Sequence, residues 1–226
     1  MSLLRELQDL TERTYSEFSG INLEEFVIGQ SHFRHLSALS GTESAQLSEA
    51  ARVFFREAND RLYLAVYFSN QVICSLENND PRRGLNNGNI IPFIVFMEEI
   101  DHCIHGSLKY IEGKRDLKSE VFIRDLELLA KIDVYQVLKF FLAWFNGSGT
   151  LEGMDRLWLR HHLFERQDTN YESTDLSERY EETGWLGEKF SRFVDGLTPE
   201  SRLQEMRMFR NLCYEAKADY IRLLPN

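Results

Sequence analysis

The segment NIIPFIVFMEEIDHCIH, residues 89–105, decides how this chain is organised. It predicts one helix that begins apolar and becomes charged without losing its apolar face. At about 3.6 residues per turn, one stripe of this helix carries Ile91, Ile94, Glu98, His102 and His105. A carboxylate and two imidazoles on the stripe that should face the core are either metal ligands or members of a satisfied buried polar network.

The sequence around this helix predicts one α+β domain over residues 1–226. We expect a small antiparallel sheet in the N-terminal half, packed on a predominantly helical C-terminal bundle. Two runs rich in β-branched and aromatic residues, Arg52–Glu57 and Arg61–Phe68, flank Ala58-Asn59-Asp60 and predict a hairpin. Residues 1–50 form an N-terminal helix and a mixed segment, 51–76 the sheet region, and 90–226 the helical region.

Hydrophobic periodicity and glycine breaks set the expected boundaries. A short strand is expected at Phe26–Ile28, and Gln71–Leu76 is either a third strand or the start of a helix. Asn89 and Thr198 are placed at helix N-caps. We expect loops over 37–44 and 77–89 and a linker over 167–177. The predicted helices cover residues 2–19, 90–112, 118–146, 151–166, 178–195 and 199–223.

The composition and net charge of the chain limit the kinds of partner that it can bind. The chain has 226 residues, 43% of them hydrophobic and 27% charged, and a net charge of −10. Binding to phosphate backbones needs an electropositive face, so this acidic balance argues against nucleic acid as a partner. No apolar run reaches the length of a membrane span, so we expect no membrane insertion either.

The cysteines and the N-terminus point to a cytoplasmic protein. Cys74, Cys103 and Cys213 are far apart in sequence and form no CxxC pair. A sparse, odd set of this kind is typical of reduced thiols. The N-terminal residues lack a basic segment followed by an apolar one, so we expect no signal peptide.

The residues Glu98-Glu99-Ile100-Asp101-His102 resemble the HExxH helix of zincin metallopeptidases, with glutamate in place of the first histidine. The resemblance implies that Glu98 and His102 bind a metal and that Glu99 is the catalytic general base. In that family a following helix supplies the third ligand. Here Glu127, followed by Ala130 and Tyr135, resembles that second helix and is the implied third ligand.

The missing first histidine alters what the resemblance implies. A set of Glu98, His102 and Glu127 is more acidic than the usual zincin set and suits iron or manganese as well as zinc. His105 could replace Glu98, because it lies three residues after His102. The Glu99-x-x-His102 spacing also occurs in ferritin-like di-iron bundles, but the chain has no second ExxH.

Two functions from different classes are therefore open. The first is a zincin-like metal-binding protein, in its active form a metal-dependent hydrolase. The alternative is a catalytically inert helical protein with a buried Glu/His/Asp network, which binds a protein partner. Asp101–His105 and Glu127–Lys131 then are ordinary i, i+4 pairs. Asp133, which interrupts an apolar line of its helix, would still need a cation beside it.

Overall fold

A computed structural model describes the whole chain except residues 40–48, 148, 166–172 and 226. The elements before the central helix are α1 (Leu3–Tyr15), η1 (Leu23–Phe26), β1 (Val27–Ile28), α2 (Gln30–Leu39), β2 (Ala51–Ala58), β3 (Arg61–Phe68), α3 (Asn70–Asn78) and η3 (Pro81–Arg83). The following elements are α4 (Ile90–Ile111), α5 (Glu120–Phe145), α6 (Gly153–Arg160), the π-helical turn η4 (His161–Glu165), α7 (Thr174–Asp195), α8 (Pro199–Arg210) and α9 (Tyr214–Leu223). The α+β class expected from the sequence is confirmed.

The sheet has the strand order β1-β3-β2. Strands β2 and β3 pair antiparallel from Ala51↔Phe68 to Ala58↔Arg61, which confirms the predicted hairpin. Asn59 and Asp60 both have positive φ, as a two-residue hairpin turn requires. The sheet is mixed and not purely antiparallel as expected, because β1 pairs parallel with β3. The chain reaches this pairing through α2, which lies between β1 and β2 in sequence.

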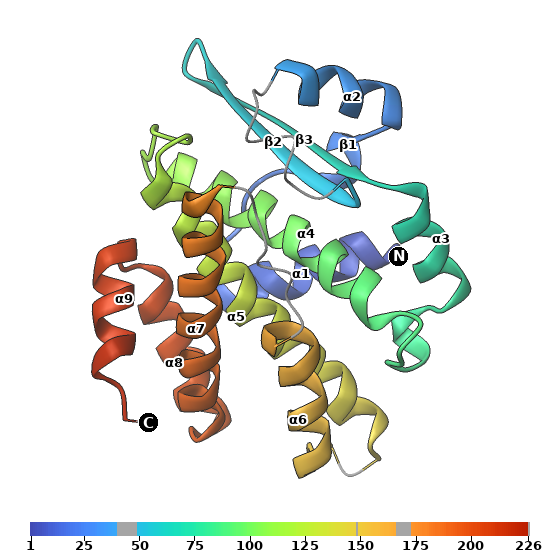
Figure 1. Cartoon of the computed structure of the whole chain (residues 1–226), viewed down its shortest axis with the longest axis vertical. Coiled ribbons are helices and arrows are strands. Elements are labelled where there is room, and N and C mark those ends of the chain that lie inside the picture. The colour runs from blue at the N-terminus through green and yellow to red at the C-terminus, as the bar shows by residue number, and fades with distance from the viewer. Residues whose placement is uncertain (40–48, 148, 166–172, 226) are drawn as a thin grey trace.

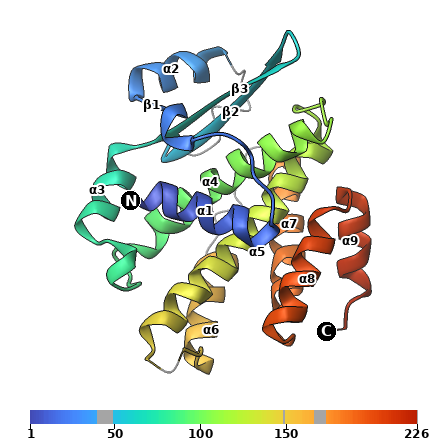
Figure 2. The ribbon, with the colours of Figure 1, turned by 180° about the vertical axis from the view of Figure 1, so that it is seen from behind.

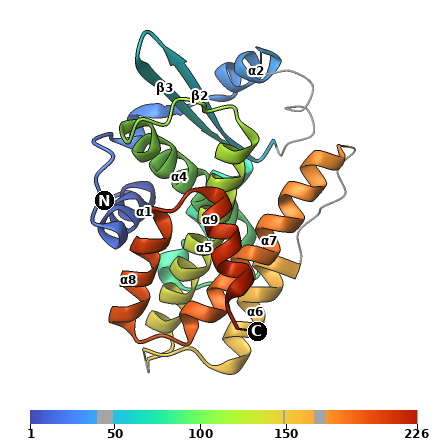
Figure 3. The same cartoon turned by 90° about the vertical axis from the view of Figure 1, so that its left-hand side faces the viewer.

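Helices α4 and α5 form the centre of the molecule. Figure 1 shows α4 beneath the hairpin, and Figure 2 shows α1 crossing α4 and α5 on the opposite face. Figure 3 shows the sheet and α2 at the top of the molecule, with α6, α8 and α9 below. One apolar core lies around α4 and includes Phe93, Met97 and Ile104. A second core joins α5 to α7, α8 and α9 around Phe190 and Phe209.

Local side-chain chemistry explains several boundaries. Thr198 caps α8 as expected, since its hydroxyl oxygen accepts a hydrogen bond from Ser201 N at 3.3 Å. Asn89 lies at the N-cap of α4, but its side chain does not bond that helix. It donates to the carbonyl oxygens of Asn79 and Gly84 and accepts from Asn86 N. Asn89 therefore holds together the loop that precedes α4.

The structure corrects other boundaries. The segment 199–223 is two helices, not one: Asn211 Nδ2 bonds Arg207 O, and the chain turns extended at Cys213 before α9 begins. This break lets both α8 and α9 pack on the second core. Residues 71–76 belong to helix α3, which Ser69 caps. Helix α7 begins at Thr174, inside the expected linker, and the N-terminal helix ends at Tyr15. The expected loop over 77–89 is confirmed from residue 79 on, between α3 and α4, and contains the short turn η3. Residues 37–39 of the expected loop over 37–44 belong to α2, and residues 40–44 and 167–172 lie outside the described residues.

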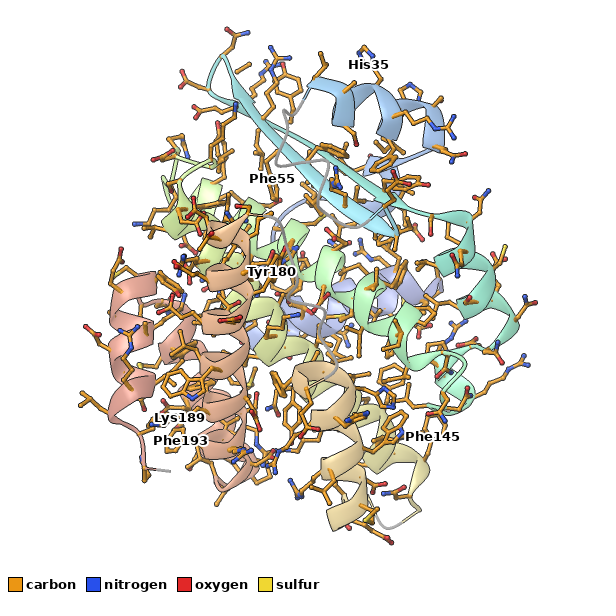
Figure 4. The ribbon with its side chains drawn as sticks, in the orientation of Figure 1. His35, Phe55, Phe145, Tyr180, Lys189 and Phe193 are labelled. Carbon is orange, nitrogen blue, oxygen red and sulfur yellow. The ribbon has the colours of Figure 1, made fainter. Side chains whose placement is uncertain are left out.

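Gly106 allows the hairpin to lie close to α4. A Cβ atom at Gly106 would stand 2.3 Å from Cζ of Phe55, whose ring lies between β2 and α4 (Figure 4). We expect Gly106→Ala to destabilise the protein by about 1–3 kcal/mol, because overpacking outweighs the gain in helix propensity. Urea unfolding measures this change.

The matched control for this substitution shortens the opposing side chain. In a Phe55→Leu background, Gly106→Ala should cost clearly less, because the ring that it meets is gone. Equal costs in the two backgrounds would show that the close approach does not limit this position.

Candidate metal centre

Three side chains converge where α4 meets α5. Asp101 and His105 lie one turn apart on α4, and Asp133 comes from α5. His105 Nε2 is 2.9 Å from Asp133 Oδ2 and 3.5 Å from Asp101 Oδ1. One ligand atom from each residue lies within 4.8 Å of the other two, and in the described part of the chain no other group of three or more acidic, histidine or cysteine residues meets this criterion. We call these three residues the buried triad.

All three residues of the buried triad are shielded from water, so their polar groups need partners within the protein. Asp101 and His105 have no exposed surface, and Asp133 is 4% exposed. Neither carboxylate oxygen of Asp101 has a hydrogen-bond partner among the described residues. A buried carboxylate without a donor or cation is costly, and such groups in proteins are normally paired or bound to a metal.

Helix α1 closes the triad from the other side. Tyr15 OH donates a 2.6 Å hydrogen bond to Asp133 Oδ1, and the Tyr15 ring meets the His105 ring edge-on at 5.0 Å. A cavity of about 20 Å³ beside Tyr15 and Asp133 is also lined by Thr11 and Gln136. Thr11 Oγ1 and Gln136 Nε2 are both buried without a partner among the described residues. The cavity is about the size of one water molecule.

The pKa values of His105 and Asp133 are both raised, which favours their protonated forms. Burial by itself lowers the pKa of His105, but the charge of Asp101, 3.5 Å away, and the hydrogen bond to Asp133 raise it to about 9. Burial raises the pKa of Asp133 to about 7, and the negative charge of Asp101 adds to this rise. Without a metal, the folded chain therefore holds protons here that the unfolded chain releases.

A second group of side chains, which we call the outer cluster, comprises Glu98, Glu99, His102, Glu127 and Lys131. His102 lies between two carboxylates, with Nδ1 3.6 Å from Glu99 Oε2 and Nε2 3.8 Å from Glu127 Oε2. Glu98 bonds Lys131 Nζ at 2.5 Å. The side chains of the acids and the histidine are 12–19% exposed, so solvent reaches this cluster.

Electrostatics in the outer cluster resemble those in the triad. Burial lowers the pKa of His102, but Glu127 and Glu99 raise it to about 9. Burial raises the pKa of Glu127, which His102 and Lys131 partly offset. Tyr180 of α7 donates a long, 3.4 Å hydrogen bond to Glu127 Oε1, and Figure 4 shows this tyrosine at the centre of the molecule.

The residues that the sequence predicted as metal ligands lie in two separate groups in the structure. Glu98, His102 and Glu127 lie in the outer cluster, whereas His105 lies in the buried triad. Glu98 already bonds Lys131, and Glu99 faces Nδ1 of His102, the nitrogen opposite the one that faces Glu127. Glu99 is thus placed to orient His102.

Asp101 and Asp133 were not among the predicted ligands. The signals for them were present in the sequence, because Asp101 stands one turn before His105 and Asp133 interrupts an apolar line on its helix. What the sequence did not show is that the two helices bring these carboxylates to the same imidazole nitrogen.

Comparison of the chain with protein-family models, with curated proteins and with solved structures finds no match. The described residues form no helix long and apolar enough to cross a membrane.

The raised pKa values predict how stability depends on pH in the metal-free protein. The pKa of Asp133 rises from 3.8 to about 7 and that of His105 from 6.5 to about 9 on folding. The folded state then binds more protons than the unfolded state, so stability falls as pH rises through this range. We expect Asp133→Asn to remove much of this fall, on the order of a few kcal/mol between pH 4 and 7.

Urea unfolding of both proteins at a series of pH values, in the presence of a chelator, measures the difference. The stability of the parent relative to Asp133→Asn should decrease steadily from pH 4 to pH 7. Parallel pH profiles for the two proteins would mean that Asp133 titrates normally.

Proposed function

We propose that this chain is a metal-binding protein that holds one divalent cation in the buried triad of Asp101, His105 and Asp133. The observation that carries this proposal is the fully buried Asp101 carboxylate, which has no hydrogen-bond partner among the described residues and only a long, 3.5 Å contact with His105 Nε2. It belongs to a group of three potential ligands that already converge.

A bound cation would contact all three groups at once, which protons on these side chains do not do. His105 Nε2 carries at most one proton, and its short contact is with Asp133 at 2.9 Å, which leaves Asp101 without a donor. A cation bound to Nε2 and to one oxygen of each carboxylate would contact all three groups. Two carboxylates also balance the charge of a dication. Imidazole with carboxylates suits zinc, iron or manganese.

The position of the triad favours a structural role for this metal. Asp101 and His105 belong to α4 and Asp133 belongs to α5, so one ion would join the two central helices. Tyr15 connects α1 to the same site through Asp133. Because Asp101 and His105 have no exposed surface, a substrate cannot reach the ion in this conformation.

A metal-dependent hydrolase is a second candidate, and its site would be the outer cluster. His102 Nε2 is buried without a hydrogen-bond partner among the described residues and faces Glu127 Oε2. The separation of these two atoms, 3.8 Å, is compatible with two ligands of one metal. A metal bound there would supply an activated water, and Glu98 would have to leave Lys131 to become a third ligand.

The inert interaction protein is the remaining alternative. In that case the triad and the outer cluster are proton-linked polar networks that specify how α4 and α5 pack, and the function lies in binding a protein partner. This alternative predicts that the folded protein contains no stoichiometric metal.

The metal content of the purified protein distinguishes between the three functions. We expect natively purified protein, produced without a metal-affinity tag, to contain about one divalent metal per chain by elemental analysis. Asp101→Asn keeps the shape of the side chain and removes its charge, and it should lower metal affinity by at least about tenfold. Glu98→Gln, a matched acid-to-amide change in the outer cluster, should leave metal content unchanged.

The reverse pattern would assign the metal to the outer cluster. No metal in the parent, with circular dichroism showing a folded chain, would overturn both metal functions and favour the interaction protein.

The hydrolase function has its own test. If the outer cluster is catalytic, the metal-loaded protein should cleave a quenched-fluorescence peptide library or activated esters. Glu127→Gln should then reduce the rate by at least about a hundredfold, while Asp101→Asn leaves it within a few fold. Hydrolysis that survives in Glu127→Gln at the parental rate would exclude the outer cluster as its source.

A further inference from the structure

A larger cavity, which we call the sheet–helix pocket, lies between the sheet and the C-terminal end of α4. Its volume is about 160 Å³. The segment after α1, helix η1, strand β3 and α4 all contribute to its wall. The apolar part of the wall consists of Ile21, Phe26, Leu62, Leu64 and Ile111.

Two hydroxyl groups in the wall of this pocket have unmet hydrogen-bonding capacity. Ser107 and Tyr110 are 3% and 9% exposed, and both line the pocket. Ser107 Oγ and Tyr110 OH are buried without a partner among the described residues. Buried polar groups in proteins are normally hydrogen-bonded, so two orphan hydroxyls in one cavity wall point to a missing partner. The third hydroxyl of the wall, on Ser19, already bonds Glu12.

Tyr110 is held firmly in place. The Arg115 guanidinium lies over the Tyr110 ring at 3.9 Å from its centre and also donates to the Tyr110 carbonyl oxygen. Stacking of this kind fixes the ring plane and therefore the position of the hydroxyl. A rigid donor in an apolar wall is how small-ligand sites set the orientation of what they bind.

Size and charge define the ligand class. An apolar cavity of about 150 Å³ in another protein takes up benzene, so the sheet–helix pocket has room for one aromatic ring. Drug-sized ligands need roughly 300 Å³ or more, which excludes nucleotides and long acyl chains. The pocket wall contains no charged side chain among the described residues, so a charged ligand would lose its hydration without compensation.

We propose that the sheet–helix pocket binds a small, neutral, single-ring aromatic molecule with one hydroxyl group, which hydrogen-bonds to Tyr110 and Ser107. Ile111 is 64% exposed and marks the outer rim, where the ligand enters. None of the residues of the buried triad or the outer cluster lines this pocket. The proposal therefore stands independently of metal binding.

Phenol and benzene are matched probes for this site. We expect phenol to bind the parent protein in isothermal titration and to raise its melting temperature, and benzene to bind threefold to tenfold more weakly. That ratio is the effect of about one neutral hydrogen bond. Benzoate, which has the same ring with a charge, should not bind.

Substitutions in the wall of the sheet–helix pocket test whether the two probes bind inside it. Tyr110→Phe should lower the affinity for phenol towards that for benzene, because only the Ser107 hydroxyl remains, and leave the affinity for benzene unchanged. Leu64→Trp fills the cavity and should abolish binding of both probes. Tyr63→Phe is the control, because Tyr63 is 51% exposed and its side chain points to the other face of β3.

The proposal is overturned by any of three results. These are no binding of phenol to the folded parent at millimolar concentrations, unchanged binding in Leu64→Trp while circular dichroism shows it to be folded, or equal loss of phenol affinity in Tyr110→Phe and Tyr63→Phe.

Discussion

Ionisable side chains at the contact between α4 and α5 constrain the rest of this structure. Water solvates such groups in the unfolded chain, and each needs a counter-charge or a hydrogen-bond partner once it is buried. Two carboxylates elsewhere in the molecule each pair with two cations. Asp125 bonds both Lys109 and Lys217, and Asp195 bonds Lys139 and Arg156. The pKa of Lys217 falls to about 8 because it is buried beside another lysine on a shared carboxylate.

The buried triad has the opposite imbalance. Two carboxylates share one imidazole, and the hydroxyl of Tyr15 serves Asp133 alone. The metal that we propose would correct this imbalance at a point where α1, α4 and α5 meet. Since the ligands come from separate helices, binding of the ion would also stabilise the folded chain, by an amount that grows with the logarithm of the ratio of ion concentration to dissociation constant.

Local patterns in the sequence predicted the parts of the fold that depend on local chemistry. The hairpin follows from its turn residues, α4 and α5 from their apolar periodicity, and the start of α8 from Thr198 and Pro199. The parallel pairing of β1 was not predicted, because two residues carry too little pattern to choose a partner strand. The break between α8 and α9 was missed because no proline or glycine marks it.

The candidate site was also predicted only as far as local sequence patterns reach. The stripe on α4 indicated polar groups facing the core, and Asp133 indicated a buried charge on the next helix. Which polar group meets which depends on the angle and register at which α5 crosses α4. Neither helix encodes this by itself. For that reason His105 was grouped with His102, although their partners, Asp133 and Glu127, lie at different points along α5.

The most direct test of the metal centre is the position of the ion itself. Crystals of the protein grown with zinc or manganese would give an anomalous difference map at the absorption edge of the metal. We expect one strong peak between α4 and α5, about 2.0–2.2 Å from His105 Nε2 and from one oxygen each of Asp101 and Asp133. A peak beside His102 and Glu127 in place of this one, or an ordered triad without any peak, would contradict the account.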